Sequence, residues 1–143
     1  MMDYRIQEAT FPFPGEEWVD SSMNIIKHPE THTSLIVTRG KIPLTRTFKE
    51  ELEFQWQQLA PLVEQLKSEP QQRVRLTQAP TVYAVETISQ FIRAENTHYQ
   101  RQLAIEHPDG KSMLILTYTA MQPFSVEEDQ YWQQVKNTLT FTV

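Results

Sequence analysis

The sequence predicts an α+β domain in which a mostly antiparallel, twisted sheet carries two helices on one face. Three observations predict this class. Short segments rich in β-branched and aliphatic residues recur along the chain, two capping-box motifs each precede an amphipathic segment, and a Pro-Asp-Gly-Lys turn joins two of the apolar segments. Strands that do not alternate regularly with helices are typical of an antiparallel sheet with segregated helices.

The N-terminal third is predicted to form strands. Residues 4–11 alternate loosely and are expected to be an edge strand ended by a pair of prolines. Trp18 is expected to plug the end of the core. Residues 22–26 and 34–39 are predicted to be two strands of a hairpin with a long, proline-containing loop.

The first helix is predicted to begin at the capping box Thr47-x-x-Glu50, where each side chain satisfies a backbone N–H of the first turn. Apolar residues recur at three- and four-residue spacing from Phe48 to Leu66, which predicts a helix of about five turns. Pro61 lies inside this segment and is expected to kink the helix near Gln57. The alternative is two shorter helices.

The second half is predicted to contain four strands and a final helix. The strands are residues 73–76, 82–92, 99–107 and 112–120. The last of them is apolar on both faces and is expected to be central. Residues 108–111 form the predicted hairpin turn before it. Ser125 and Glu128 form the second capping box, which begins the last helix.

Two helices on one face would leave the other face of the sheet uncovered. In residues 22–26, Met23 and Ile25 point to one side and Asn24 and Ile26 to the other, so apolar groups occupy both faces. An ordinary core hairpin is one interpretation. The other is that the uncovered face forms an apolar concavity or an oligomer interface, because large exposed apolar patches mark binding sites.

Composition narrows the class of protein. The 143 residues fit one domain, 1–143, and the absence of cysteine excludes disulfides and thiolate sites. The net charge of −5 and the scattered basic residues argue against nucleic-acid binding. Only three glycines occur, far apart, so no phosphate loop is expected. No secretory signal and no apolar run of ~20 residues are visible, which predicts a cytoplasmic protein without stable membrane association.

No pattern in the sequence indicates catalysis. His28 and His32 lie four apart in a loop without an adjacent third ligand, which disfavours a metal site. No serine lies in a nucleophile elbow. The paired glutamates open turns or helices, where the helix dipole favours them. We therefore expect no enzyme, with no catalytic residue, no metal and no cofactor.

Several segments taken together resemble a known family. They are Ser22-Met23-Asn24-Ile25-Ile26-Lys27-x-Pro29, Ser34-Leu35-Ile36-Val37-Thr38-Arg39-Gly40, Gln57-Gln58-Leu59, Arg101-Gln102-Leu103, and Pro123-Phe124 ahead of Tyr131-Trp132. In this order they resemble the Eag effector chaperones, which belong to a wider family related to DcrB. The Rhs-associated branch is the most similar. The resemblance extends from Tyr4 to about Leu139.

The resemblance implies a Mog1/PsbP-like fold and a bacterial, cytoplasmic homodimer that serves type VI secretion. Such chaperones hold the N-terminal transmembrane segments of PAAR-domain effectors before loading onto the VgrG spike. Carried over by position, the apolar groove residues are Met23, Ile25, Ile36 and Leu66, and the polar ones are Gln58 and Gln102. The family often has isoleucine at the position of Met23, and methionine adapts its shape readily. A shift of one residue would exchange Ile36 for Leu35 or Val37.

Physical reasoning is compatible with this function. A transmembrane helix in water exposes about 20 apolar residues, which an apolar sheet face can shield. Polar side chains in the same groove can satisfy the serines and threonines of the helix. Two other functions remain open at this point: a carrier of a small apolar ligand such as a lipid, and a Mog1-like interaction module for a soluble partner.

Overall fold

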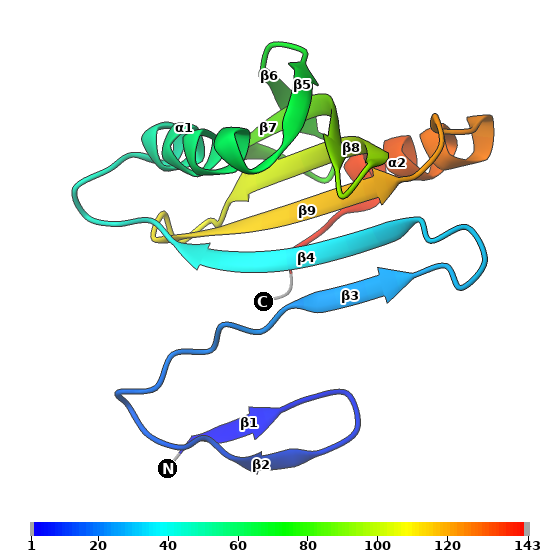
Figure 1. The fold of residues 1–143 in the computed structure, drawn as a ribbon. Coiled ribbons are helices and arrows are strands. Elements are labelled where there is room, and N and C mark those ends of the chain that lie inside the picture. The colour runs from blue at the N-terminus through cyan, green and yellow to red at the C-terminus, as the bar shows by residue number, and fades with distance from the viewer. Residues whose placement is uncertain (1, 142–143) are drawn as a thin grey trace.

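A seven-stranded antiparallel sheet forms the body of the protein in the computed structural model, which describes residues 2–141 (Figure 1). The strand order is β3-β4-β9-β8-β7-β5, and β6 also pairs with β7. The strands are β3 (Asn24–Lys27), β4 (Ser34–Lys41), β5 (Glu64–Ser68), β6 (Gln72–Leu76), β7 (Ala79–Arg93), β8 (Asn96–Glu106) and β9 (Ser112–Ala120). The predicted α+β class and mostly antiparallel sheet are confirmed.

The predicted turn before β9 is confirmed. Gly110 adopts a positive φ of 72°, a conformation that glycine tolerates without a Cβ clash. The Asp109 carboxylate accepts hydrogen bonds from the backbone N–H groups of Lys111 and Ser112 at 2.8 and 3.2 Å. The bond from Lys111 lowers the pKa of Asp109 below its usual value. This turn fixes the register of β8 and β9, so Leu103 lies opposite Leu116.

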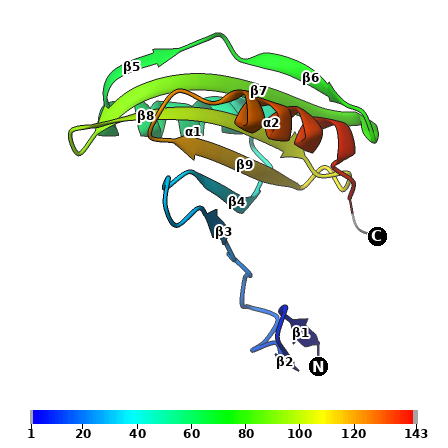
Figure 2. The same cartoon turned by 90° about the vertical axis from the view of Figure 1, so that its right-hand side faces the viewer.

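The two helices, α1 (Phe48–Leu59) and α2 (Val126–Thr138), both begin at the predicted capping boxes. They lie on opposite faces of the sheet. Phe48 and Leu52 of α1 pack on Ala104 and Ile115. Trp132 of α2 instead packs with the residues next to these two in the strands, which are Leu103, Ile105 and Leu116. Successive residues of a strand point to opposite faces. In Figure 2, α2 accordingly lies in front of the strands and α1 behind them.

The prediction of two helices on one face is therefore wrong. The helices lie on opposite faces because parts of β8 and β9 are apolar on both sides, and both sides therefore need a cover. The buried residues of β9 alternate between the two clusters, with Met113 and Ile115 under α1 and Leu116 and Tyr118 under α2.

The segment after α1 also differs from the prediction. The helix ends at Leu59, and residues Ala60–Leu62 form a 3-10 turn that contains Pro61. Val63 is already extended, with φ −129° and ψ 159°, and β5 follows. Both the five-turn kinked helix and the pair of helices are wrong. Proline removes the N–H that would continue the helix, and the edge of the long strand β7 offers backbone groups that pair with β5 instead.

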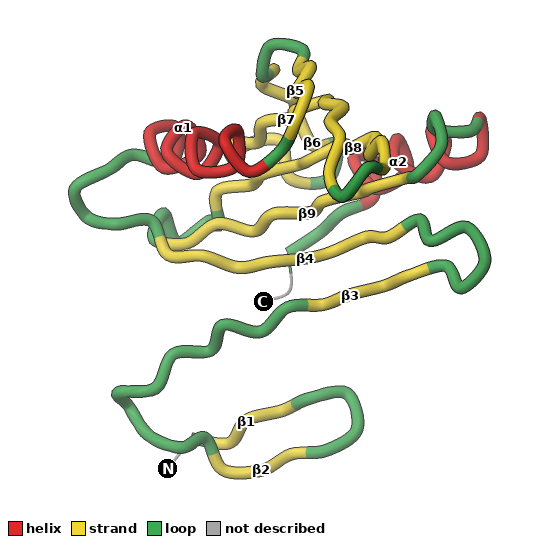
Figure 3. Tube along the Cα trace, viewed as in Figure 1, coloured by secondary structure: helices red, strands yellow, loops and turns green. Residues whose placement is uncertain are grey.

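The N-terminal segment forms a separate unit. Strands β1 (Asp3–Arg5) and β2 (Thr10–Pro12) pair only with each other in a two-stranded sheet, so the predicted single edge strand is a hairpin. Figure 3 shows this hairpin beyond β3, joined to it by a long loop. Trp18 in that loop is 64% exposed and does not plug the core, so this prediction is also wrong.

Neither α1 nor α2 has the length and apolar character that a bilayer-crossing helix requires; this holds for residues 2–141.

Candidate functional site

The helix α1 covers only one end of its face of the sheet. Its contacts centre on Val85, Ala104, Met113 and Ile115, which lie side by side on β7, β8 and β9. Beyond this cluster the face continues toward β3 without a helix above it. We call this part the open face; it comprises Ile25, Ile36, Thr117, Gln102 and Thr87 in one row, and Ser34, Thr119, Gln100 and Ser89 in the next.

The strand register sets each row. Ile25 pairs with Ile36, Ile36 with Thr117, Thr117 with Gln102, and Gln102 with Thr87. Because directly opposite residues of antiparallel strands point to the same face, the five side chains cross the sheet from the β3 edge to β7. The second row is built the same way. The open face is thus apolar at its β3–β4 side and polar across β9, β8 and β7.

Several polar side chains of the open face form no hydrogen bond in the described part of the chain, although Thr87, Ser89 and Gln100 are themselves buried. Within residues 2–141, the side chains of Thr117, Gln102 and Gln100 form no hydrogen bond, and none of their polar atoms is among the buried unsatisfied ones. Amide and hydroxyl groups with free donors and acceptors can satisfy polar groups of something that docks on them. A partner with a mostly apolar surface and a few hydroxyls would match both halves of the open face.

Three of the six residues expected to bind a partner meet in this first row. Ile25, Ile36 and Gln102 share it, and the register places Leu35 and Val37 on the α2 face instead. Met23 directly precedes β3 and follows the alternation of Ile25. Met23 is 55% exposed and Ile25 62% exposed, so neither belongs to the core.

The two other expected residues lie at the border of the open face. Gln58 is exposed near the end of α1, one turn beyond Gln55, whose side chain reaches the Met113 sulfur at 3.7 Å. Leu66 is half-buried on β5 rather than on the predicted helix. Leu66 lies two residues before Ser68 in β5, so the two side chains point to the same face of the sheet. Ser68 pairs with Ser89, which belongs to the open face. Both residues thus belong to elements that border this side of the sheet.

Sequence reasoning missed the other polar residues of the open face on β7, β8 and β9, which we call the polar floor together with Gln102. Thr117 and Thr119 follow Ile115 at two-residue spacing in β9, and this change from apolar to hydroxyl residues was a visible signal. Thr87, Ser89 and Gln100 gave a weaker signal, since their place depends on the pairing of β7 with β8.

The opposite face is closed by α2 through a buried polar contact. The Trp132 indole N–H donates to the Glu86 carboxylate, which the Lys136 ammonium also contacts at 3.2 Å. The Tyr118 ring stacks with Phe124 and with Trp132. Burial raises the pKa of Tyr118 to about 12, and the nearby Glu128 carboxylate adds to the rise. These contacts hold the helix in place on the sheet.

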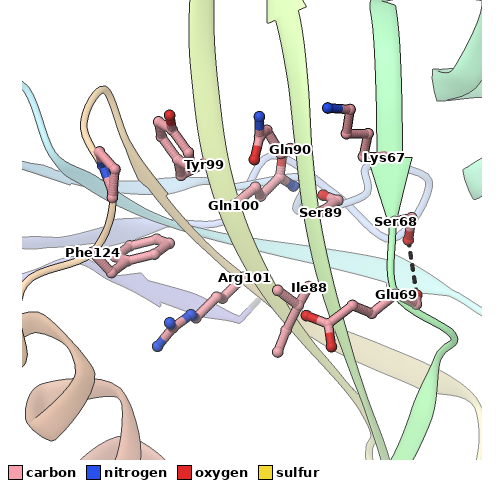
Figure 4. A pocket seen from close by; sticks show the side chains of 11 residues that line it. Lys67, Ser68, Glu69, Ile88, Ser89, Gln90, Tyr99, Gln100, Arg101 and Phe124 are labelled. Carbon is pink, nitrogen blue, oxygen red and sulfur yellow. Dashed lines mark hydrogen bonds between the residues drawn. The ribbon is translucent and has the colours of Figure 1, made fainter.

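Two cavities border this closed face. One, of about 660 Å³, lies between the β3–β4 hairpin and the start of α2 and is lined by Ile26, Leu35, Tyr118 and Tyr131 among others. The other, of about 490 Å³, lies near β5 and Phe124 and is also lined by Ser89 and Gln100, so it reaches the second row of the open face (Figure 4). Arg101 at its rim is bound to Asp129 and stacks on Phe124 at 4.4 Å. In the described part of the chain, no three His, Asp or Glu residues group as metal ligands would.

Comparison with known proteins shows the fold through a solved structure and the family through a family model. A crystal structure described as a protein of unknown function, PA94 from Pseudomonas aeruginosa, a putative regulator, superimposes with a TM-score of 0.79. The match covers 100% of this chain and 98% of that one at 23% identity, so it shows the shared fold. No curated protein matches. The DcrB family model matches residues 8–138, and the chain therefore belongs to the DcrB family.

Proposed function

We propose that this protein is a chaperone that binds a transmembrane-type helix on its open face. The helix would belong to the N-terminal region of a PAAR- or Rhs-type secretion effector, which the chaperone shields in the cytoplasm and delivers to the VgrG spike as a homodimer. No catalytic step is part of this function. The effector class comes from the resemblance to the Eag chaperones, and membership of the DcrB family is compatible with it.

One observation carries the proposal: a single row across the sheet combines the exposed Ile25 and the half-buried Ile36 with amide and hydroxyl groups that form no hydrogen bond within residues 2–141. A surface that bound only hydrocarbon would have no use for Gln102 and Thr117. Transmembrane helices pack on one another through apolar surface together with Ser, Thr and amide contacts. The open face offers the same combination in water.

A second function is favoured by a different observation. The cavity of about 660 Å³ beside Ile26 and Tyr131 is mostly apolar and large enough for a small apolar ligand. A carrier of such a ligand would use this cavity, on the side of the sheet opposite the open face. The two functions therefore depend on different side chains of the same short strand.

Neighbouring isoleucines of β3 separate the two functions. Ile25 and Ile26 are each 62% exposed, but Ile25 faces the open face and Ile26 lines the cavity. The probe is a synthetic 20-residue Leu/Ala helix with two serines and terminal lysines, and its Kd is measured by fluorescence anisotropy. We expect Ile25→Asp to weaken binding at least tenfold. We expect Ile26→Asp to leave the Kd within about threefold of the wild type.

The double variant Met23→Asp/Ile25→Asp enlarges the effect to roughly two to four orders of magnitude, since each buried apolar side chain contributes about 1.5–3 kcal/mol. Its melting temperature should stay near that of the wild type because both side chains are exposed. Gln102→Ala should cost only about 0.5–2 kcal/mol of binding. Unchanged helix binding by the folded double variant would overturn the proposal. The carrier is tested separately by measuring the binding of a fatty acid, and a loss of that binding in Ile26→Asp but not in Ile25→Asp would establish the carrier instead.

A further inference from the structure

The cavity of about 660 Å³ on the α2 side of the sheet is mostly apolar but has a charged wall. Its floor is a row of Ile26, Leu35 and Tyr118, which the pairing of β3, β4 and β9 places side by side. The start of α2 forms the opposite wall with Glu128 and Tyr131. In Figure 1 the β3–β4 loop and the start of α2 lie at the same end of the sheet. We call the space between these five residues the tyrosine cavity.

Tyr118 brings an unpaired hydroxyl to this cavity. The residue is only 7% exposed, and its hydroxyl forms no hydrogen bond within residues 2–141 without being one of the sealed, unsatisfied atoms there. Burial raises the pKa of this phenol most, and Glu128 and Tyr131, which both line the cavity, raise it further. The hydroxyl therefore lies toward those two residues. Because a buried hydroxyl without a partner is costly, this one is suited to a polar group of a bound molecule.

Glu128 supplies a fixed negative charge beside that hydroxyl. One carboxylate oxygen accepts a hydrogen bond from the Ser125 backbone N–H at 2.8 Å, and the other accepts one from the Thr33 hydroxyl at 3.1 Å. An ionised carboxylate offers about four acceptor positions, so each oxygen can accept a second hydrogen bond. The carboxylate is thus held between the β3–β4 loop and α2 and can still accept from a ligand.

The N-terminus of α2 does not make the cavity an anion site. Its first turn carries Glu127, Glu128 and Asp129, whose charges already complement the positive end of the helix dipole. The Ser125 hydroxyl accepts a hydrogen bond from the Glu128 N–H at 3.1 Å, which completes the capping box. A second anion at this end of the helix would meet three negative charges. The electrostatics of this wall therefore favour a cation.

The rest of the lining fits a cation with an apolar stem. Tyr131 is 41% exposed, and its ring centroid lies 5.6 Å from that of Tyr118 at an interplanar angle of 57°. An ammonium group close to an aromatic ring is attracted by the negative face of the ring. The apolar floor can pack against a hydrocarbon stem. Lys27 and His28, the other titratable residues of the lining, are exposed at the rim, farther from the buried Tyr118.

We propose that the tyrosine cavity binds a primary ammonium group on an apolar stem, either the lysine side chain of a partner or a long-chain amine. The ammonium group donates hydrogen bonds to the Glu128 carboxylate and to the Tyr118 hydroxyl, and the Tyr131 ring lies beside it. The stem lies along Ile26 and Leu35. A carboxylate on the same stem is disfavoured by its like charge to Glu128. The cavity is on the side of the sheet opposite the open face, so the inference does not rest on helix binding.

Probes with the same eight-carbon stem and different head groups test the site. Octylammonium, octanol and octanoate are titrated into the full chain at neutral pH, and binding is followed by the NMR signals of side-chain methyl groups. We expect octylammonium to bind at least tenfold more tightly than octanoate, with uncharged octanol between them. The methyl shifts should centre on Ile26 and Leu35, whereas Ile25 and Ile36 point to the open face. Equal or tighter binding of octanoate, or shifts centred on Ile25 and Ile36, would overturn the proposal.

Substitutions of single groups test the contacts. Glu128→Gln removes the charge but keeps a side chain that can form the capping box, and we expect it to weaken octylammonium binding about tenfold. Glu127→Gln is the matched control, because Glu127 lies outside the lining and its loss changes the net charge equally. Tyr118→Phe keeps the ring and should weaken binding about threefold. Equal effects of Glu128→Gln and Glu127→Gln would contradict a direct contact.

A lysine peptide distinguishes the two sources of the ammonium group. The probe is an acetylated Leu-Lys-Leu amide, compared with octylammonium in the wild type and in Glu128→Gln. Tighter binding of the peptide would assign the site to the lysine of a partner, and tighter binding of octylammonium would assign it to a long-chain amine. Either assignment requires the binding to weaken in Glu128→Gln. Failure of both probes to bind at millimolar concentrations would overturn the proposal and leave helix binding by the open face unaffected.

Discussion

The two faces of the sheet are built on opposite rules. Under α2, the sheet side chains are large and apolar, and Trp132 is completely buried among Leu103, Ile105 and Leu116. On the α1 side, apolar residues stop at the row of Ile115 and Ala104, and hydroxyl and amide side chains follow in the same strands. In β8 and β9 the chain thus places apolar side chains where α1 packs, and polar ones beyond it.

The difference begins with the lengths of chain that cover each face. Pro61 ends α1, and the chain then turns into β5 at the edge of the sheet instead of continuing across it. A helix of about five turns would have been roughly 27 Å long and would have covered more of the face. The open face exists because the segment that could have covered it is a strand.

The largest expected effect is on folding, and it distinguishes two neighbouring residues of β4 whose side chains point to opposite faces. Leu35 is buried in the α2 cluster, and Ile36 is half-buried on the open face. We expect Leu35→Asp to prevent folding, because a buried, unpaired carboxylate costs an amount comparable with the whole stability of a domain, about 5–15 kcal/mol. Ile36→Asp should remain folded. Circular dichroism during thermal unfolding measures both, and equal loss of structure would contradict the distinction between the faces.

A smaller effect is expected where α2 is anchored. Trp132→Ala should lower the free energy of unfolding by about 3–5 kcal/mol, because it leaves a large void and removes the indole donor to Glu86. Trp132→Phe should cost less, since it keeps most of the volume. Urea unfolding provides the measurement. Trp56→Ala on α1 is the matched control: Trp56 is only half-buried, and a cost as large as that of Trp132→Ala would contradict the comparison.

The smallest effect appears only at alkaline pH. The pKa of Tyr118 is raised to about 12 in the folded protein, above the ordinary value of 10.0. The stabilisation by the neutral phenol is fully present below pH 10 and is lost as pH rises toward 12, because only the unfolded chain ionises this tyrosine easily. The urea concentration at the unfolding midpoint should therefore decrease as the pH is raised from 10 to 12. Tyr118→Phe should reduce that fall, and an identical pH profile in the variant would contradict this origin.

Local signals predicted most of the secondary structure. Both capping boxes, the turn at Asp109 and Gly110, and strand β9 lie where the sequence indicated them, since each depends on residues close together in the chain. The structure pairs Ile25 with Ile36 and places Gln102 in the same row; these are three of the positions carried over from the resemblance, and their role in binding stays a prediction. Those residues share a face through strand alternation alone once the register is known.

Other features required the tertiary structure. Apolar spacing from Phe48 to Leu66 indicated one helix, but β7 has a free edge on which residues 64–68 form a strand instead. The assignment of helices to faces depends on which rows of β8 and β9 each one buries. The polar floor depends on three successive strand registers, each of which a one-residue shift would reverse.

The sequence by itself determined the α+β class, the helix starts, the turn before β9 and the apolar character of β3, because short-range hydrogen bonds and side-chain periodicity specify them. Only the tertiary structure decided that the helices lie on opposite faces, that Pro61 leads into β5, and that Thr117 and Gln102 join Ile25 and Ile36 in one row. These features arise from pairing between distant segments, where backbone groups and apolar side chains find partners that no local pattern identifies.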